Sequence, residues 1–507
     1  MNQGILVYDI GTTSVKSAVF DLSGVLIGSV SVPYETHYPR PGWAEQDPEQ
    51  FWFAAIQGTR KLLVFPEISS REIAAVGLTG HMNGCLPVDI DGRPSYPELI
   101  HADSRSGVQS ARIRSLLGED YLYQETANPT DEHLSLPKIL WLRDEQECAF
   151  ERTAWFLNAK DYLRFKLTGV LGYTDFSDAS LTGAFNLKKR DWSWDIIDAL
   201  DLPRERFPTV RNSIEKGGVL SKEAATVLGL TQGIPVSLGG GDASCATRGS
   251  GISGSRQAYV SLGSSAWVSR LSPAPVLDPK RRIQNFFDLD GRSCNVCGTL
   301  QSAGIALDWA IRLLGGDKME DPLDYRRLEK DLEAVPPGSD GVIFLPYLMG
   351  ERTPHWDASA RGMFIGLSLS SNPKTLLRSV YEGIAFGLKE IIDIYGALSM
   401  PIDSLILLGG GIRSDFWWRI IGDTIGKPVI IHPFPTQAIS LGAAMAAGVA
   451  AGIWSSLEEV PGTGVLSGER FTADPEKNKV YARYYTLYQG IYRQVKPICD
   501  GLAEIRK

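Results

Sequence analysis

Two stretches of the sequence share one order of residues: a strand, a glycine, two hydroxyl side chains and a second strand. The first is YDIGTTSVKSAVFD (residues 8–21), and the second is AYVSLGSSAWVSRL (residues 258–271). Their glycines, Gly11 and Gly263, are 252 positions apart (263 minus 11), about half of the 507-residue chain. A repeat at this distance predicts a duplicated domain that holds a ligand between two hairpins. Coincidence is the simpler alternative, because glycine–serine turns between strands are common.

The first stretch also places a carboxylate, Asp9, at the end of its first strand, just before Gly11, Thr12 and Thr13. Backbone N–H groups of a glycine-rich turn can surround a phosphate, hydroxyl groups add donors, and an acid at the strand end can hold Mg²⁺. A plain hairpin is the other interpretation, since small and polar residues relieve turn strain. Taken alone, this stretch favours the plain hairpin.

Length and charge limit the class of protein. A chain of 507 residues is too long for one ordinary core and predicts roughly two to four domains. The formal net charge is −8, with a pI near 5.5 and no basic run. This charge argues against a nucleic-acid surface. An anionic substrate would then need local compensation from Mg²⁺, Lys or Arg.

The sequence predicts a cytoplasmic protein that does not enter a membrane. Asp9 interrupts the apolar N-terminal stretch, so we expect no signal peptide. The least polar segment, AISLGAAMAAGVAAGIW (residues 438–454), predicts a buried helix, because a membrane span needs about 20 apolar residues. Six cysteines are too few for a disulfide scaffold. Cys294 and Cys297 form a lone C-x-x-C without a second pair or a nearby histidine, so we assign them no metal or redox role.

Strand and helix patterns alternate and predict an α/β fold. A hairpin is expected over residues 5–34, a strand over 73–80, and helices over 136–146 and 158–169. Residues 234–257 contain a strand, three glycines, an aspartate and a short helical stretch. Gly249, Gly251 and Gly254 spell G-x-G-x-x-G, but they lead into a strand, which argues against a dinucleotide motif. We expect these glycines to form a linker between domains.

A third glycine-rich turn lies in SLILLGGGIRSDFWWRIIGDTIG (residues 404–426), which predicts a strand, three glycines and a helix. Ser414 is a candidate N-cap of that helix. Three glycines at a strand end let the backbone approach a flat ligand such as adenosine closely. Tight strand-to-helix turns also favour glycine, which is the structural alternative.

Asp9 and Asp242 are both strand-end aspartates next to glycines. Phosphoryl transfer to an alcohol needs a base for the hydroxyl proton and a metal to neutralise the phosphates, and one aspartate could serve each task. Either could instead be a helix cap or a turn residue. Neither a Walker A motif nor the protein-kinase set of H-R-D and D-F-G is present, so a nucleotide site would belong to another class.

In combination, these motifs resemble those of the FGGY carbohydrate kinases, in the superfamily of actin, heat-shock chaperones and hexokinase, and most of all the xylulose kinase branch. DIGTTSVKSAVFD resembles the first phosphate motif, VSLGSSAWV the second, GGGDAS the catalytic loop and LGGGIRSDFWWRIIGD the adenosine motif. Two family signatures are similar to HLSLPKILWLRDE (residues 133–145) and GMFIGLSLSSNPKTLLRSVYEG (residues 362–383), with His133 and Thr375 as departures.

The resemblance implies two ribonuclease H-like domains with a cleft between them, and an ATP- and Mg²⁺-dependent sugar kinase. Residues 1–248 would bind the sugar and carry the first phosphate motif and the base, and residues 249–507 would carry the second phosphate motif and bind adenosine. Asp242 matches the general base, and Asp9 matches the acid that holds Mg²⁺. The nucleotide-binding positions would be Gly11, Thr12, Thr13, Gly263, Ser264, Ser265, Gly410, Gly411 and Asp415. Many members are dimers, so a homodimer is a candidate.

The substrate positions depart from the xylulose kinase pattern. Xylulose kinases typically read G-Q-M-H-G where this chain has GHMNG (residues 80–84). The usual tryptophan before the next acid is His101. The implied substrate-binding residues are His81, Met82, Asn83, His101, Asp103 and Asp242. A ketopentose such as xylulose is the first expectation; another ketose, a polyol or a sugar acid stays open, and His81 and His101 could instead be core histidines.

Two functions from other classes also stay open. An actin-like or chaperone-like ATPase would use the same hairpins, although no separate peptide-binding domain follows the second half. A catalytically silent sugar sensor would share the scaffold, although Asp9 and Asp242 are both retained. ATP turnover that depends on a sugar would separate a kinase from both.

Overall fold

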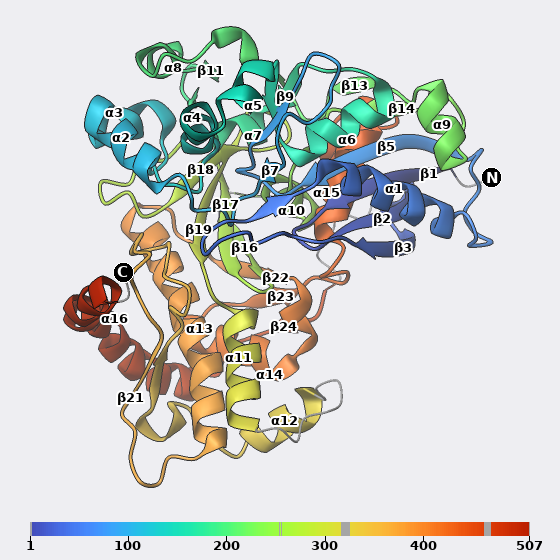
Figure 1. Cartoon of the computed structure of the whole chain (residues 1–507). Helices are drawn as coiled ribbons and strands as arrows, with labels where there is room; N and C mark the ends of the chain where they lie inside the picture. The colour runs from blue at the N-terminus through green and yellow to red at the C-terminus, as the bar shows by residue number, and fades with distance from the viewer. Residues whose placement is uncertain (1–2, 253, 255, 316–324, 461–467, 506–507) are drawn as a thin grey trace. The chain divides into compact units, whose positions relative to one another are not determined.

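The computed structural model describes residues 3–252, 254, 256–315, 325–460 and 468–505 (Figure 1). The chain folds into two compact units, each assembled from three separate segments. The first unit consists of Met1–Gly251, Leu271–Val296 and Gln437–Gly464, and the second of Ile252–Arg270, Cys297–Thr436 and Val465–Lys507. The first unit therefore takes segments from both halves of the sequence.

A mixed sheet forms the centre of the first unit. Its strands are β1 (Gly4–Ile10), β2 (Ser14–Asp21), β3 (Leu26–Pro33), β5 (Ile73–Gly80), β13 (Lys216–Val219), β14 (Pro235–Ser237) and β15 (Gly240–Gly241). The order is β13-β14-β5-β1-β2-β3, and β15 pairs with β5. β1 runs antiparallel to β2 and parallel to β5. All seven residues of β1 are buried, as expected for a strand with helices on both faces of its sheet.

Alternate residues of β1 belong to different cores, because successive side chains of a strand point to opposite faces. Leu6 and Tyr8 pack with α1 (Pro48–Leu62), α6 (Ala159–Thr168) and α9 (Lys222–Leu228). Ile5 and Val7 pack with α10 (Asp242–Gly249) and α15 (Ala438–Ala450). In Figure 1 the orange α15 lies among the blue elements of this unit. The helix expected over 438–454 is therefore confirmed as a buried helix of the first unit.

Glycines let α15 approach its neighbours closely. A Cβ atom on Gly442 would lie 1.9 Å from the carbonyl oxygen of Cys245, and one on Gly249 would lie 1.7 Å from that of Ala438. On β5, a Cβ atom on Gly77 would lie 2.5 Å from the carbonyl oxygen of Ala443. Gly249 is thus the last residue of α10 and packs on α15, so the expectation that it belongs to an interdomain linker is wrong. β16 begins at Gln257, which agrees with the rejection of a dinucleotide motif there.

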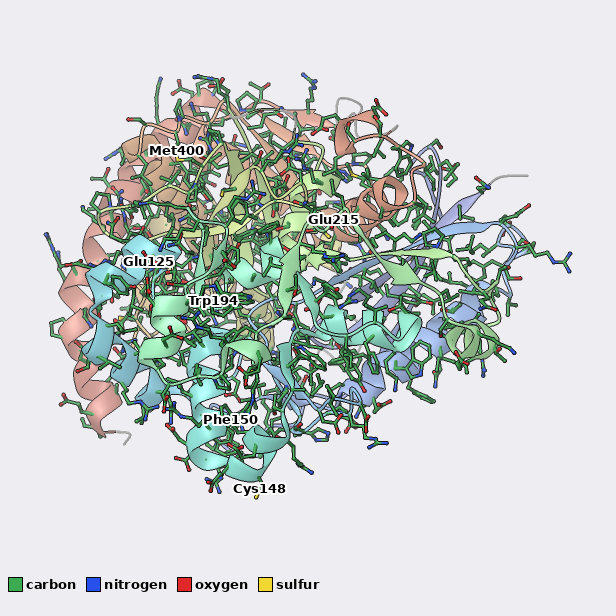
Figure 2. The ribbon with its side chains drawn as sticks, turned by 90° about the horizontal axis from the view of Figure 1, so that it is seen from above. Glu125, Cys148, Phe150, Trp194, Glu215 and Met400 are labelled. Carbon is green, nitrogen blue, oxygen red and sulfur yellow. The ribbon has the colours of Figure 1, made fainter. Side chains whose placement is uncertain are left out.

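The rest of the first unit is a helical region with short strands. Its helices are α2 (Gly107–Leu117), α3 (Glu119–Thr126), α4 (Ser135–Glu145), α5 (Glu147–Arg152), α7 (Phe176–Ser180), α8 (Trp194–Ala199), η1 (Arg204–Arg206) and η4 (Leu457–Glu459). Its strands are β4 (Glu45–Gln46), β6 (Leu86–Val88), β7 (Glu98–Leu99), β8 (Trp155–Leu157), β9 (Tyr173–Asp175), β10 (Phe185–Asn186), β11 (Asp191–Trp192), β12 (Thr209–Arg211) and β18 (Gln284–Phe287). An aromatic core holds this region together. Phe150, labelled in Figure 2, contacts Phe156, which in turn contacts Phe207.

The second unit repeats the hairpin arrangement. Its sheet contains β16 (Gln257–Leu262), β17 (Ala266–Ser272), β22 (Ser404–Leu408), β23 (Val429–Ile431) and β24 (Arg470–Phe471). β16 runs antiparallel to β17 and parallel to β22, as β1 does to β2 and β5. The duplicated hairpin seen in the sequence is therefore confirmed. β19 (Cys294–Leu300) begins in the first unit and ends in the second, and its two cysteines are buried free thiols.

Helices flank the second sheet. They are α11 (Gly304–Gly315), α12 (Tyr325–Leu332), α13 (Pro373–Ala397), α14 (Asp415–Ile425), α16 (Pro475–Ile505), η2 (Ser339–Gly341) and η3 (Gly410–Arg413), with a small hairpin of β20 (Ile343–Leu345) and β21 (Met363–Ile365). Ser414 caps α14 as expected, because its hydroxyl accepts the Trp417 N–H at 3.0 Å. Within the described ranges, none of the helices combines the length and apolar character needed to cross a bilayer.

Candidate active site

Three parallel strands of the first unit end side by side. Asp9 of β1 pairs in register with Thr79 of β5, and Gly241 of β15 pairs with Gly80 of β5. His81 follows β5 directly and donates its backbone N–H to the carbonyl of Ile10 at 3.0 Å. Ligands of α/β sheets bind at the carboxyl ends of the strands. The fold thus brings Asp9, His81 and Asp242, all predicted site residues, to one edge of one sheet.

Asp9 is 7% exposed and sits between a cation and a hydroxyl group. The Lys16 ammonium, on the neighbouring strand, lies 3.5 Å from its Oδ2 atom, and the Ser440 hydroxyl of α15 donates to the same oxygen at 3.3 Å. No group of three or more His, Cys, Asp or Glu side chains that could hold a metal occurs in the described part of the chain. Mg²⁺ keeps several waters and often takes one or two carboxylates plus substrate phosphates, so a single carboxylate is a sufficient protein ligand.

Asp242 is the first residue of α10, and its carboxyl group is close enough to Asp9 to be affected by the charge of that carboxylate. Its Oδ1 atom accepts the N–H of Ala243 at 2.7 Å. Burial, and secondarily the negative charge of Asp9, raises the pKa of Asp242 to about 7. A general base works best when its pKa lies near the operating pH. The environment of Asp242 therefore suits a group that accepts a proton at neutral pH.

The loop after β5 carries three predicted substrate positions, His81, Met82 and Asn83. A Cβ atom on Gly241 would lie 2.5 Å from the Cγ and Sδ atoms of Met82, so the Met82 side chain rests on the residue before Asp242. Asn83 has a left-handed backbone with φ of 64°, which asparagine adopts more readily than most residues. The loop is therefore held tightly against the strand that leads to Asp242.

Lys138 joins this loop to the one that carries His101. It projects from α4, and its ammonium donates to the carbonyls of Asn83, Ile100 and His133, each at 2.8 Å. All three N–H donors of the ammonium are used. Burial lowers the pKa of Lys138 to about 8, against the raising effect of nearby acids, first of all Asp103. Lys138 had no role in the sequence analysis, although a lysine within the apolar run LPKILWL indicates a buried cation.

His81 has a buried acidic neighbour that sequence reasoning missed. The Nε2 atom of His81 and the Oε2 atom of Glu98 are 3.9 Å apart, and the rings of His81 and His101 have centroids 5.8 Å apart. Burial lowers the pKa of His81 to about 4 and raises that of Glu98 to about 8. Both pKa shifts therefore favour the uncharged form of the side chain near pH 7. Such groups are suited to hydrogen bonding with neutral polar groups rather than to ion pairing.

The carboxylate of Asp103 already accepts hydrogen bonds from neighbouring residues. Its oxygens accept from the Arg105 guanidinium, with the Nη2–Oδ2 distance at 2.6 Å, and from the N–H of Ala44 at 2.6 Å. Arg105 also pairs with Glu45 at 2.7 Å and lies over the ring of Trp43. In this arrangement Asp103 anchors the loop that carries His101.

The carbonyl groups of both hairpin turns accept hydrogen bonds within their own unit, from side chains in the first turn and from backbone N–H groups in the second. In the first, Tyr34 Oη donates to the carbonyl of Gly11, and the Gln46 amide donates to that of Thr12 at 2.7 Å. In the second, the N–H of Gly304 donates to Gly263, and those of Ala303 and Ile305 donate to Ser264, at 2.9 to 3.1 Å. The tips at Thr13, Gly263 and Ser264 are exposed. Both turns are therefore fixed through their carbonyls while their tips face solvent.

The three glycines before α14 are not equivalent. A Cβ atom would lie 2.4 Å from the Leu262 carbonyl oxygen if placed on Gly409, which also has φ of 93°, and 2.8 Å from the Leu262 side chain if placed on Gly411. A Cβ atom on Gly410 would meet nothing within 4 Å, so packing does not explain this glycine. Asp415 begins α14, is exposed and pairs with Arg419 at 3.3 Å. Gly410 and Asp415 are thus open positions beside the turn.

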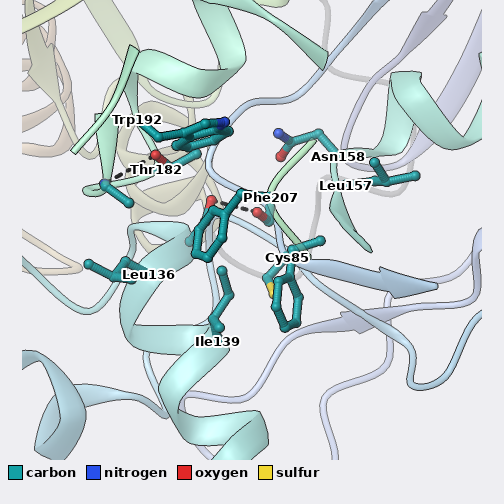
Figure 3. Close-up of a pocket in the computed structure, with 12 residues that line it drawn as sticks. Cys85, Leu136, Ile139, Leu157, Asn158, Thr182, Trp192 and Phe207 are labelled. Atoms are coloured by element: carbon teal, nitrogen blue, oxygen red, sulfur yellow. Dashed lines mark hydrogen bonds between the residues drawn. The ribbon is translucent and has the colours of Figure 1, made fainter. Parts of the chain in front are cut away.

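The first unit also contains a small pocket that is not this site. Cys85, Leu136, Ile139 and Phe207 contribute to its largely apolar wall, and Asn158 is among the polar residues that also line it (Figure 3). A sugar ligand needs several hydrogen-bonding partners, which an apolar wall does not offer. Asp9 and Asp242 are not among the residues that line it.

Comparison with known families agrees with the geometry. The N-terminal domain of the FGGY family of carbohydrate kinases matches residues 4–249, and its C-terminal domain matches residues 258–451. The chain belongs to the FGGY family of carbohydrate kinases. The enzyme class and the use of ATP as a substrate that the sequence predicted are therefore confirmed.

Individual relatives cover nearly the whole chain. A xylulose kinase of Bacillus subtilis (strain 168) is 30% identical over 499 residues, which cover 98% of each protein. A xylulose kinase of Lactococcus lactis subsp. lactis (strain IL1403) is 32% identical over 504 residues, covering 99% of this chain and 98% of that protein. The expected resemblance to the xylulose kinase branch is confirmed.

Solved structures show the same fold. A ligand-bound xylulose kinase from Lactobacillus acidophilus superposes with a TM-score of 0.88 at 26% identity, covering 97% of this chain and 98% of that chain. A gluconate kinase from the same organism also has a TM-score of 0.88 at 26% identity, covering 98% of each. The predicted α/β fold with two ribonuclease H-like domains is confirmed, and the same fold serves kinases named for different sugars.

Proposed function

We propose that this FGGY kinase transfers the γ-phosphate of ATP to a hydroxyl group of a small uncharged sugar or polyol, with a ketopentose such as xylulose as the first candidate. The observation that carries the proposal is the position of Asp9 and Asp242 at the ends of β1 and β15, the strands that both pair with β5, with the pKa of Asp242 raised to about 7. This pair supplies one carboxylate for a metal and one for a proton.

In the proposed reaction, Asp242 accepts the proton of the sugar hydroxyl as that oxygen attacks the γ-phosphate. Asp9 is the residue that would hold Mg²⁺, which neutralises phosphate charge when it is bound. Lys16, 3.5 Å from Asp9, adds a positive charge at the same place. Each of these groups serves positioning and electrostatics, which are the main contributions of proteins to phosphoryl transfer.

We assign the remaining contacts by the family motifs. Gly11, Thr12 and Thr13 with Gly263, Ser264 and Ser265 would hold the phosphates, and Gly410, Gly411 and Asp415 would lie at the adenosine. His81, Met82, Asn83, His101 and Asp103 would form the sugar side, Asp103 by anchoring the His101 loop through Arg105. Residues 1–248 and 249–507 are the proposed functional halves, in line with the two family models.

The charges around the sugar positions favour an uncharged substrate over a sugar acid. Two cations hold the loops of Asn83 and His101, and both are engaged: Lys138 by three carbonyls and Arg105 by two carboxylates. A substrate carboxylate would therefore find no free ammonium or guanidinium in these loops. The neutral His81 and Glu98 fit sugar hydroxyls better. The printed name of the gluconate kinase neighbour makes gluconate the substrate to test against this argument.

We also propose a cytoplasmic location, since ATP and sugar are found there and the cysteines are free thiols. The proposal of a homodimer rests on the family alone. Light scattering of the purified protein measures its oligomeric state.

The test is ADP release with Mg²⁺-ATP fixed across ketopentoses, ketohexoses, pentitols, erythritol, glycerol and gluconate. We expect one strong responder among the uncharged compounds and none from gluconate. Asp242→Asn should lower kcat about 10²- to 10⁴-fold, because it removes the base. Asp47→Asn, at the N-cap of α1, is the matched control and should leave kcat unchanged. ADP release that no sugar stimulates, or full turnover by Asp242→Asn, would overturn the proposal.

A further inference from the structure

A fully buried cluster of four charged side chains is linked by hydrogen bonds to the residue before Asp242. The proposed function gives this cluster no role. The Lys160 ammonium is 2.7 Å from Asp161, 2.9 Å from Asp175 and 3.0 Å from Asp178, and all four side chains are at most 1% exposed. Burying charges is costly unless they are paired and hydrogen-bonded. Packing alone would be served as well by apolar side chains, so this arrangement calls for another explanation.

The cluster has one cation and three acids, and this excess of acids shifts the pKa values of its members. Burial, and then the neighbouring carboxylates, raises the pKa of Asp178 well above its ordinary value. Burial opposes the charge of Lys160, but the three aspartates outweigh it and raise the pKa of Lys160 well above its ordinary value. These aspartates therefore favour the charged form of Lys160, whose ammonium lies 2.9 Å from Asp175.

Hydrogen bonds lead from this cluster to the residue before the base. Oδ2 of Asp175 accepts the hydroxyl protons of Ser177 and, at 2.7 Å, of Ser213. The Oγ atom of Ser177 accepts the backbone N–H of Gly241 at 2.8 Å. The path is therefore Lys160, Asp175, Ser177, Gly241, and the next residue is Asp242. Hydrogen bonds with an ionised partner are about twice as strong as neutral ones, and chains of them reinforce one another.

Gly241 is a point where the backbone needs external support. β15 has only two residues, and Gly241 has no side chain of its own to anchor it. Asp242 follows at once, and its carboxylate direction depends on the backbone at this point. Catalytic groups act within narrow tolerances, and a 1 Å misplacement can cost roughly a hundredfold in rate.

We propose that Ser177 is a positioning residue for phosphoryl transfer: held by Asp175 and Lys160, its hydroxyl fixes the backbone at Gly241 and so aims the Asp242 carboxylate. The inference rests on the proposed role of Asp242 as the base. Ser177 itself contacts neither sugar nor nucleotide in this scheme. It belongs to α7, five residues long, which the sequence analysis left without a role.

Ser213 provides a matched control within the same cluster. Both serines are fully buried and both donate to Oδ2 of Asp175, but Ser177 is the one whose hydroxyl accepts from Gly241. Replacing either by alanine removes one hydroxyl from Asp175 and disturbs the cluster similarly. A difference in kcat between the two variants therefore reports the contact with Gly241.

The experiment compares Ser177→Ala, Ser213→Ala and Ser177→Thr with the wild type, using the sugar that the wild type phosphorylates best. We expect Ser177→Ala to lower kcat roughly 10- to 100-fold with both KM values within about threefold, since binding groups are untouched. Ser213→Ala should keep kcat within about twofold of the wild type, while its melting temperature falls about as much as that of Ser177→Ala. Ser177→Thr, which keeps the hydroxyl, should recover most of kcat. Amide exchange of the Gly241 N–H, followed by mass spectrometry, should be faster in Ser177→Ala only.

Several results would overturn the inference. Equal losses of kcat in Ser177→Ala and Ser213→Ala would show that the cluster acts only through stability. Full kcat in Ser177→Ala, or unchanged exchange at Gly241, would show that the contact does not position the base. If Ser177→Ala does not fold, Ser177→Cys, a weak acceptor of similar size, takes its place with the same expectations. A wild type that phosphorylates no sugar would instead refute the proposed function, and the inference with it.

Discussion

At the scale of single residues, Asp242 links activity to stability. Its pKa in the folded protein is about 7, whereas an aspartate in an unfolded chain titrates near 3.9. Between these pH values the unfolded chain has released this proton and the folded protein has kept it. The contribution of Asp242 to the free energy of unfolding therefore falls as the pH rises from about 4 to about 7, and stays low above that.

We therefore expect Asp242→Asn to be more stable than the wild type at pH 8, by at least about 2 °C in melting temperature, although its kcat is much reduced. The difference should shrink towards pH 4, where the wild-type aspartate is protonated in the folded protein and about half protonated in the unfolded chain. Thermal unfolding followed between pH 4.5 and pH 8, without nucleotide or sugar, measures it. If the variant is less stable than the wild type at pH 8, the ionised carboxylate of Asp242 does not destabilise the folded protein.

Some residues of the site can be recognised from short sequence motifs, whereas others become apparent only from tertiary contacts. Asp9 and Asp242 follow apolar strands and precede or follow glycines, so short motifs reveal them. Glu98 and Ser177 lie in short elements without such a pattern, and only tertiary contacts bring them to His81 and Gly241. Asp103 was matched by motif, but its hydrogen bonds to Arg105 and Ala44 could be known only from the fold.

At the scale of elements, the contact between α10 and α15 controls the site. α10 carries Asp242, and α15 carries Ser440, which donates to Asp9. Gly442 is the close contact, since a Cβ atom there would lie 1.9 Å from the backbone carbonyl oxygen of Cys245. Backbone atoms cannot turn aside as a flexible side chain can, so the two helices would have to separate.

Gly442→Ala should thus destabilise the protein by about 1–3 kcal/mol and lower kcat/KM, because the separation moves both aspartates. Gly490→Ala in α16 is the matched control: a Cβ atom there meets nothing within 4 Å, and alanine favours a helix by about 1 kcal/mol over glycine. Chemical denaturation and steady-state kinetics measure both effects. Equal stability of the two variants would mean that the helices tolerate the added methyl group without moving.

Local sequence predicts several of the helices and strands but not how they pack together. The two hairpins, β5, α4, α6 and α15 follow from apolar periodicity and turn residues, which are local properties. The place of α15 against β1 and β5 does not, because it depends on contacts between residues more than 400 positions apart, such as Asp9 and Ser440. Periodicity likewise gave no reason to join residues 271–296 to the first unit.

At the scale of the whole molecule, the first compact unit is not continuous in sequence. Leu271–Val296 and Gln437–Gly464 complete it, and α15 in the latter covers the face of the sheet that bears Ile5 and Val7. A chain that stops at residue 251 would expose this apolar face to water, at about 25 cal/mol for each Å² uncovered. It would also lose the hydroxyl of Ser440 from Asp9.

We therefore expect a fragment of residues 1–251 to show no cooperative thermal transition and to associate through its uncovered face. A fragment in which flexible linkers join residues 1–251, 271–296 and 437–464 should unfold cooperatively, because every element packed on the first sheet is present. Circular dichroism melting and light scattering of the two fragments make the comparison. A sharp transition in the shorter fragment would mean that α15 is dispensable for this core, and that its contacts with α10 and β5 serve the site alone.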